Sequence, residues 1–276
     1  MKLKGMLIKA SAAMTAAYKG HNNDPVWLVH IPKTGGTSFK YIMQRQFHHR
    51  FHMPRPGSDE LCFEKGAGRT YKTMVLFRDP EKHVYSQYLE CKHDGWGKAV
   101  TKGTGFPRGF DDEDETTGYM PNFELWLNHF KFSKDHFNCY YPYNMQTRYM
   151  SCKAGEDGHA YIGGSHIKLR TALDNLHKAW SIGLTSQMAA SVCLFRAMEG
   201  HLRSGDVCGS KNIKLIHERH GVPARHNIED LSPEVRQTIQ EFIKDDAVLY
   251  EAAKRIFLQR IQNMKTYRNI TILLDN

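Results

Sequence analysis

Short apolar runs alternate along the chain with segments whose apolar residues recur every three or four positions. Three short apolar runs predict buried strands, at 26–29, 72–78 and 180–184. The helical spacing predicts amphipathic helices at 38–47, 122–132 and 165–179. At 276 residues, one large α/β domain is the simplest organisation.

Several helix starts are marked by capping residues. Asp79 is a plausible N-cap, because Pro80 suits the first helical position. Ser186 is expected to cap a helix that follows the third strand, and Ser232 to cap one long helix whose apolar face runs from Val235 to Phe257. The glycine-rich, polar stretch at 93–120 is expected to be a solvated loop, with a lid or acceptor-contacting loop as the alternative.

The domain is expected to span 25–265, with 1–24 as an N-terminal lead-in and 266–276 as a C-terminal tail. The apolar stretch near the N-terminus is interrupted by Lys9, Ser11 and Thr15, which indicates a poor signal peptide or none. No run approaches the roughly 18 apolar residues of a membrane span.

The first predicted strand leads into a turn that carries one lysine, two glycines and several hydroxyl groups, Pro32-Lys-Thr-Gly-Gly-Thr-Ser38. Strand, glycine-rich turn and helix form a phosphate cradle, because backbone N–H groups and the helix N-terminus face the anion. Gly35 and Gly36 lack a Cβ and let the backbone approach closely. A turn that binds nothing is the alternative, but such turns seldom combine these residue types.

The position of the lysine distinguishes this loop from the phosphate loop of nucleotide triphosphatases. There the lysine follows the glycines, whereas Lys33 precedes Gly35 and Gly36. The stretch His30-Ile-Pro-Lys-Thr-Gly-Gly-Thr-Ser38 resembles the 5′-phosphosulfate-binding loop of sulfotransferases that use 3′-phosphoadenosine 5′-phosphosulfate (PAPS). The sequence of this stretch is similar to that of the branch of the family that includes carbohydrate 2-O-sulfotransferases and bacterial relatives.

A second stretch carries the same resemblance. Arg78-Asp-Pro80, with Ser86 eight residues after the arginine, resembles the family's 3′-phosphate-binding motif. From the residues alone, Arg78 ends a predicted strand and Ser86 lies about two turns into a helix, so both could reach one ligand at the carboxyl edge of a sheet. Asn144-Met-Gln-Thr-Arg148 resembles a family segment near the cleft. The resemblance implies a three-layer α/β sandwich with a central, mostly parallel sheet.

The resemblance also implies residue roles. Lys33 would stabilise charge on the oxygen that leaves with adenosine 3′,5′-bisphosphate, and Arg78 with Ser86 would hold the 3′-phosphate. The 5′-phosphate would be held by the N–H groups of the loop and by three hydroxyls, those of Thr34, Thr37 and Ser38. No metal is expected, because a sulfuryl group carries less charge than a γ-phosphoryl group.

The acceptor hydroxyl needs a general base within hydrogen-bond reach. His52 is the preferred candidate, because His52-Met-Pro resembles an element of short bacterial relatives and histidine suits this role near neutral pH. The alternatives are His48, His49, Glu60 and Glu64. Each histidine taken alone is more often a surface residue.

The composition of the chain indicates which kinds of ligand and which cellular compartment are expected. A net charge of +9 suggests an anionic partner, which PAPS satisfies without nucleic acid. The six cysteines lack zinc spacing, so reduced cysteines and a cytoplasmic location are the simpler expectation, with the Golgi lumen as the alternative for a truncated chain. Cys139 and Cys152 could pair. The basic stretch 200–226 includes Lys211 and Lys214, which could grip an anion or simply be solvated.

These features favour a PAPS-dependent sulfotransferase whose acceptor is a carbohydrate hydroxyl. A small-molecule alcohol, phenol or amine acceptor is the nearest alternative. A P-loop kinase would need a lysine after the glycines and a strand ending in a metal-binding aspartate. A nucleic-acid-binding protein would need a basic stripe with base-stacking aromatics, whereas the basic residues of this chain are dispersed.

Overall fold

The computed structural model describes most of the chain outside the N-terminal lead-in and several connecting segments. The described residues are 26–47, 51–52, 62–63, 72–101, 122–132, 139–152, 168–216 and 228–275. The predicted lead-in at 1–24, and most of the predicted loop at 93–120, lie outside them. Among the described helices, none is long and apolar enough to cross a membrane.

Four parallel strands form the main sheet, in the order β2-β1-β3-β4. They are β1 (Val26–Val29), β2 (Phe51–His52), β3 (Lys72–Phe77) and β4 (Ser181–Leu184). The end of β1 lies beside the middle of β3, because Val29 is opposite Val75. The last four residues of β3, from Met74 to Phe77, pair in turn with β4. The α/β class predicted from the sequence is therefore confirmed, and the predicted strands are correct to within one residue.

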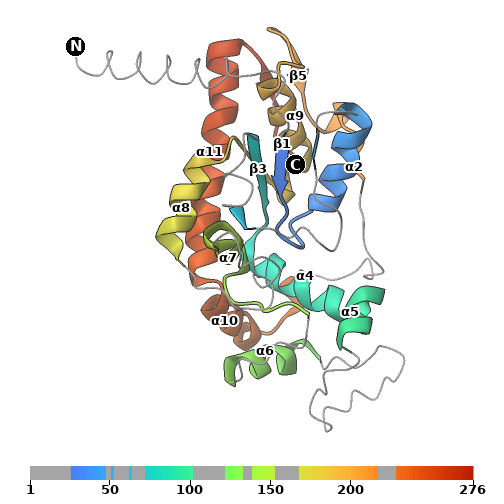
Figure 1. Cartoon of the computed structure of the whole chain (residues 1–276), viewed down its shortest axis with the longest axis vertical. Coiled ribbons are helices and arrows are strands. Elements are labelled where there is room, and N and C mark those ends of the chain that lie inside the picture. The colour runs from blue at the N-terminus through green and yellow to red at the C-terminus, as the bar shows by residue number, and fades with distance from the viewer. Residues whose placement is uncertain are drawn as a thin grey trace, which may run out of the picture.

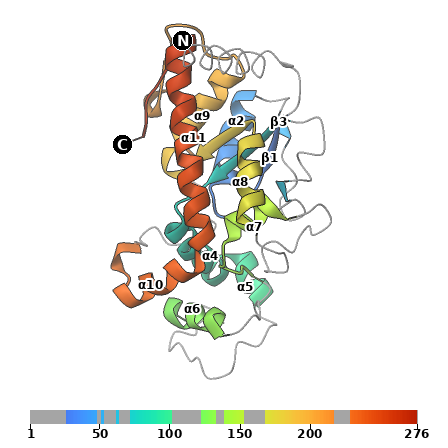
Figure 2. The ribbon, with the colours of Figure 1, turned by 90° about the vertical axis from the view of Figure 1, so that its left-hand side faces the viewer.

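Helices lie on both sides of this sheet (Figure 1). Helices α2 (Gly36–Phe47) and α9 (Met188–Met198) lie on one side, where Phe39 meets Phe195 edge to face with ring centroids 6.2 Å apart. Helices α8 (Leu169–Lys178) and α11 (Lys244–Arg268) lie on the other side and stand in front of the sheet in Figure 2. Strands β1, β3 and β4 are buried on both faces from end to end, except for the partly exposed Lys72, which explains their mainly apolar sequence.

A second group of helices lies below the carboxyl edge of the sheet in Figure 1. The group comprises α4 (Pro80–His93), α5 (Gly95–Thr101), α6 (Phe123–Phe132), α7 (Met145–Ser151) and α10 (Pro233–Phe242). Aromatic side chains join α4 to α6, where Tyr88 contacts both Phe123 and Trp126 at centroid distances of 5.0 and 5.6 Å. Helix α5 corrects the prediction of a loop throughout 93–120. Asp94 accepts a hydrogen bond from the N–H of Trp96 and so caps its first turn.

Two of the predicted caps are confirmed and one is wrong. The Asp79 carboxylate accepts from the N–H of Lys82, and the Ser232 hydroxyl accepts from that of Val235. Ser186, in contrast, lies within the 3₁₀ turn η1 (Thr185–Gln187) that precedes α9. The first turn of α9 is capped by Asp275, whose carboxylate accepts from the N–H groups at 189 and 190.

The long helix predicted after Ser232 is two helices, α10 and α11, which meet at Ile243. The break is stabilised from a distant segment. Asn144 Oδ1 accepts hydrogen bonds from the N–H groups of Asp245 and Asp246 and so caps α11. The carboxylate of Asp246 accepts hydrogen bonds from the N–H groups of Gln146 and Thr147 and so caps α7. The two helices therefore cap each other reciprocally.

The segment predicted as a C-terminal tail is part of the fold. Strand β6 (Thr271–Ile272) pairs in parallel with β5 (Val207–Cys208), and Ile270 is fully buried. Two further 3₁₀ turns are η2 (Ser210–Asn212) and η3 (Ile228–Asp230). Strand β5 lies near the top of Figure 1, and α4 lies below the main sheet. Lys211 lies in η2, the turn that follows β5.

The expectation of reduced cysteines is wrong, because all six cysteines are paired. The disulfides are Cys62–Cys152, Cys91–Cys139 and Cys193–Cys208, with Cα–Cα distances of 5.4, 6.0 and 5.7 Å. Cys139 and Cys152 thus each bind a different partner and not one another. Pairing follows from tertiary proximity, since the bridged cysteines of the first two disulfides lie 90 and 48 positions apart.

Candidate functional site

The glycine-rich turn and Arg78 meet at the carboxyl edge of the main sheet. The turn follows β1 and Arg78 follows β3, and these two strands are neighbours. The chain leaves β1 toward β2 on one side, whereas β3 leads to β4 on the other. Such a reversal of strand order opens a crevice at the carboxyl edge of a parallel sheet, where ligands of open α/β folds bind.

Three consecutive carbonyl groups of the turn accept hydrogen bonds from side chains outside it, those of Pro32, Lys33 and Thr34. His83 Nε2 lies 2.7 Å from the first, Arg78 Nη1 3.0 Å from the second, and Thr185 Oγ1 2.5 Å from the third. In a trans peptide the N–H points away from the carbonyl of the same unit. Because the carbonyls of Pro32 and Thr34 are turned toward the protein, the N–H groups of the same peptides, those of Lys33 and Gly35, are turned the other way, as an anion cradle requires. The N–H of Thr34 instead donates to the carbonyl of Ile31 over 3.4 Å and so closes the turn.

His83 is a buried neutral group that holds the turn. Burial lowers its pKa to about 3, and the hydrogen bond to the carbonyl of Pro32 opposes this only in part. Gln87 Nε2 donates to Nδ1 of His83 over 3.2 Å, so Nε2 carries the proton that binds Pro32. The sequence pattern placed this residue within a helix but did not reveal its partner, which comes from 51 positions earlier in the chain.

The two glycines are required by the packing of the turn itself. A Cβ at Gly36 would lie 2.3 Å from the ring of His30, and one at Gly35 would lie 2.9 Å from Cε of Met188. Gly35 also has φ of +85°, a conformation that residues with a Cβ rarely adopt. Lys33 adopts a left-handed conformation too, with φ of +62°, and non-glycine strain of this kind is typical of functional turns.

The three hydroxyl residues of the turn are placed differently. Thr34 is only 1% exposed, and its Oγ1 donates to the carbonyl of Ile31 over 2.8 Å. Its side chain therefore shapes the turn and is not directed at a phosphate. Thr37 and Ser38 are half-buried in the first turn of α2, where N–H groups also lack carbonyl partners within the helix. These two remain the hydroxyl candidates for binding an anion.

Arg78 and Ser86 come together as the motif spacing predicted. Nη1 of Arg78 donates to Oγ of Ser86 over 2.9 Å, and the same nitrogen donates to the carbonyl of Lys33. Burial lowers the pKa of Arg78, and the nearby Asp79 carboxylate opposes that effect. The backbone of Arg78 is held by Gln146, whose side-chain amide accepts from its N–H and donates to its carbonyl. The polar run that contains Gln146 is thus buried behind the site.

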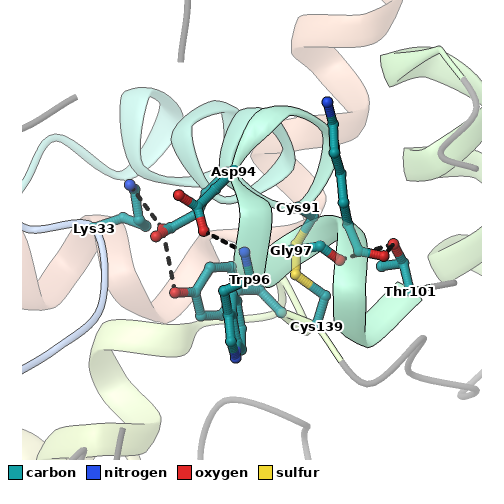
Figure 3. Close-up of a disulfide and its surroundings, with 10 residues drawn as sticks. Lys33, Cys91, Asp94, Trp96, Gly97, Thr101 and Cys139 are labelled. Carbon is teal, nitrogen blue, oxygen red and sulfur yellow. Dashed lines mark hydrogen bonds and ion pairs between the residues drawn. A yellow bond between two sulfur atoms is a disulfide. The ribbon is translucent and has the colours of Figure 1, made fainter. Parts of the chain in front are cut away.

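The ammonium of Lys33 forms an ion pair with Glu90, with 2.7 Å between Nζ and Oε2 (Figure 3). Glu90 lies near the end of α4 and also accepts a hydrogen bond from the phenol of Tyr140 over 3.2 Å. Neither Glu90 nor Tyr140 was singled out from the sequence. The contact joins segments that only the folded chain brings together, so no local pattern reveals it.

The general base stays a prediction. His52 ends β2, and its backbone lies opposite Trp27 of β1, but its side chain lies outside the described part of the structure. The alternatives, His48, His49, Glu60 and Glu64, also lie outside it.

No protein-family model matches the chain, and no curated protein matches it. Within the described ranges, no group of three or more histidine, cysteine or acidic residues is arranged to hold a metal ion. The case for a function therefore rests on the geometry of the crevice between β1 and β3.

Proposed function

We propose that the protein is a sulfotransferase that moves a sulfuryl group from PAPS to a hydroxyl acceptor. The observation that carries this proposal is the placement of Lys33, Arg78 and Ser86 around one crevice. A single nitrogen, Nη1 of Arg78, lies 3.0 Å from the carbonyl of Lys33 and 2.9 Å from Oγ of Ser86. A nucleotide with phosphates at both its 5′ and 3′ positions could therefore contact the Lys33 turn with its 5′-phosphate and the Arg78–Ser86 pair with its 3′-phosphate.

The proposed reaction is an in-line displacement at sulfur, in which positioning and charge stabilisation provide most of the rate enhancement. The acceptor oxygen forms a bond to sulfur while the bond from sulfur to the 5′-phosphate oxygen breaks. The acceptor proton passes to the general base, for which His52 is the proposed residue. Lys33 stabilises the charge on the leaving oxygen, and adenosine 3′,5′-bisphosphate departs.

The two phosphate groups would be held by different parts of the crevice. The N–H groups of the turn and the first turn of α2, with the hydroxyls of Thr37 and Ser38, would hold the 5′-phosphate. Arg78 and Ser86 would hold the 3′-phosphate. The fold we propose for this site is a three-layer sandwich in which the turn serves as a P-loop-like phosphosulfate loop.

We propose a carbohydrate as the acceptor, with a small-molecule alcohol, phenol or amine as the alternative. The three disulfides support the Golgi lumen over the cytoplasm, because disulfides form and persist in oxidising compartments and are rare in the cytosol.

The proposal is tested by sulfate transfer from labelled PAPS to a panel of sugar and small-molecule acceptors. Replacing Lys33 with alanine should lower the rate by about a hundredfold or more, the usual effect of removing a group that stabilises transition-state charge. A near-normal rate in Lys33→Ala would contradict the assigned role. Arg45→Ala is the matched control, since it removes a positive charge from the last turn of α2 without touching the crevice.

The 3′-phosphate contact is tested by binding. Arg78→Ala should weaken the binding of adenosine 3′,5′-bisphosphate far more than the binding of adenosine 5′-monophosphate, because only the bisphosphate carries a 3′-phosphate. Calorimetric titration of both nucleotides measures this difference. Equal weakening of the two nucleotides would argue against the contact, and no binding of the bisphosphate to the wild-type protein would overturn the proposed function.

A further inference from the structure

The ion pair between Lys33 and Glu90 is partly shielded from water. The side chain of Lys33 is 13% exposed and that of Glu90 is 12% exposed, with 2.7 Å between the charged atoms. Exposed ion pairs are weak because water screens them and both side chains keep their freedom. Lys33 and Glu90 are not in that situation, so the carboxylate restricts where the ammonium can lie.

Glu90 is itself held from two directions. Its Oε2 accepts from the phenol of Tyr140, which is only 5% exposed, as well as contacting Lys33. The two residues next to them in sequence, Cys91 and Cys139, are joined by a disulfide with a Cα–Cα distance of 6.0 Å. Figure 3 shows this disulfide in the same view as Lys33 and the dashed line of its ion pair. The end of α4 and the segment that carries Tyr140 therefore cannot separate and release the carboxylate.

We propose that Glu90 is a positioning residue for Lys33, which fixes the ammonium in the place where it meets the leaving oxygen of the donor. The inference rests on the proposed sulfotransferase function and adds a component to it. Glu90 acts through Lys33, because its carboxylate contacts the ammonium of Lys33 and the phenol of Tyr140.

This role has two opposed effects on the reaction. An oriented ammonium stabilises the leaving oxygen more than a mobile one does, because its alignment costs nothing during the reaction. The carboxylate, in contrast, places a negative charge beside a donor that is itself strongly negative, and so it weakens nucleotide binding. Glu90 should therefore raise kcat while it lowers affinity. Replacing a residue that served only the stability of the fold would lower kcat and nucleotide affinity together.

The test compares Glu90→Gln with the wild-type protein by steady-state sulfate transfer and by calorimetric titration with adenosine 3′,5′-bisphosphate. We expect kcat to fall by about 10- to 100-fold, within the range seen when electrostatic alignment is lost. We expect the bisphosphate to bind about three- to tenfold more tightly, since one nearby negative charge is removed. Glu90→Asp, which keeps the charge on a shorter side chain, should recover part of kcat.

Asp94→Asn is the matched control. Asp94 follows α4 one turn after Glu90, and its carboxylate accepts from the N–H of Trp96 and not from Lys33. Asparagine can accept the same hydrogen bond, so only the charge is lost. Small changes in both quantities in Asp94→Asn would show that the effect of Glu90 depends on its contact with Lys33 and not on net charge.

Three outcomes would overturn the inference. Unchanged kcat in Glu90→Gln would remove the positioning role, and weaker bisphosphate binding would assign Glu90 to the fold alone. Loss of the acid limb of the pH–rate profile in Glu90→Gln would make Glu90 the general base. The proposed function fails separately, if the wild-type protein neither binds the bisphosphate nor transfers sulfate.

Discussion

Replacing His83 with glutamine should make the protein less sensitive to acid. His83 is fully buried, and burial lowers its pKa to about 3, from an ordinary value near 6.5. Between these two pH values the unfolded chain binds a proton at this position and the folded protein does not. Stability therefore falls as the pH drops below about 6.5, and continues to fall until the folded protein is also protonated.

The size of the effect follows from the distance to the ordinary pKa. Near pH 5 the unfolded histidine is about 1.5 pH units below its pKa, and each unit is worth about 1.4 kcal/mol, so His83 costs about 2 kcal/mol there. Glutamine can still donate an amide N–H toward the carbonyl of Pro32 but does not titrate. The loss of stability between about pH 7.5 and pH 5 should therefore be about 2 kcal/mol smaller in His83→Gln.

Urea unfolding with the disulfides intact, followed by tryptophan fluorescence at both pH values, measures the difference. Asp246 titrates in the opposite sense, because burial raises its pKa to about 6 and its protonation favours the folded state as the pH falls. Asp246 is present in both proteins, so its contribution cancels in the comparison. His177→Gln, at an exposed position on α8, is the control and should keep the wild-type response. An equal loss of stability in His83→Gln and wild type would refute the reasoning.

Three further changes test the turn, a disulfide and a cap. The double variant Cys91→Ala/Cys139→Ala should lose about 4 kcal/mol of unfolding free energy, since the bridge closes a loop of 48 positions, and an unchanged urea midpoint would contradict it. Gly36→Ala should abolish nucleotide binding and lower the unfolding free energy by about 1–3 kcal/mol, because the new methyl group would overlap the ring of His30. Normal nucleotide binding in a calorimetric titration would show that the turn can adjust. Asp275→Ala should lower the unfolding free energy measured in the same urea titration by about 1 kcal/mol, because it removes the cap of α9. An unchanged unfolding free energy would mean that water replaces the carboxylate.

The sequence predicts features that local chemistry decides. The strand at 26–29 is short and apolar, and the residues that follow it have the turn and helix preferences of a phosphate cradle. The cap at Asp79 also depends only on its neighbours. The spacing of Arg78 and Ser86 was sufficient to place both on one crevice, since a strand end and the second turn of the next helix have little freedom relative to each other.

Features decided by distant segments were missed or predicted wrongly. The apolar spacing that predicts a helix after Ser232 continues through Ile243, so the break between α10 and α11 leaves no local sign. The break is stabilised by Asn144, about a hundred positions earlier. Similarly, Asp275 caps α9 in place of the nearby Ser186. The disulfide partners and the contact of Lys33 with Glu90 depend in the same way on which segments the fold brings together.

The attachment of three successive carbonyl groups of the turn to His83, Arg78 and Thr185 has a consequence for how the site could be transferred to another protein. Arg78 and His83 belong to one strand–helix segment and Thr185 to another, 45, 51 and 151 positions after the carbonyls they bind, so the orientation of the turn is encoded well outside the turn itself. An isolated copy of residues 26–47, or the same motif grafted after a strand elsewhere, would have to order its backbone when the anion binds, and would lose affinity accordingly. The binding motif visible in the sequence is therefore necessary for the cradle but is not a portable module.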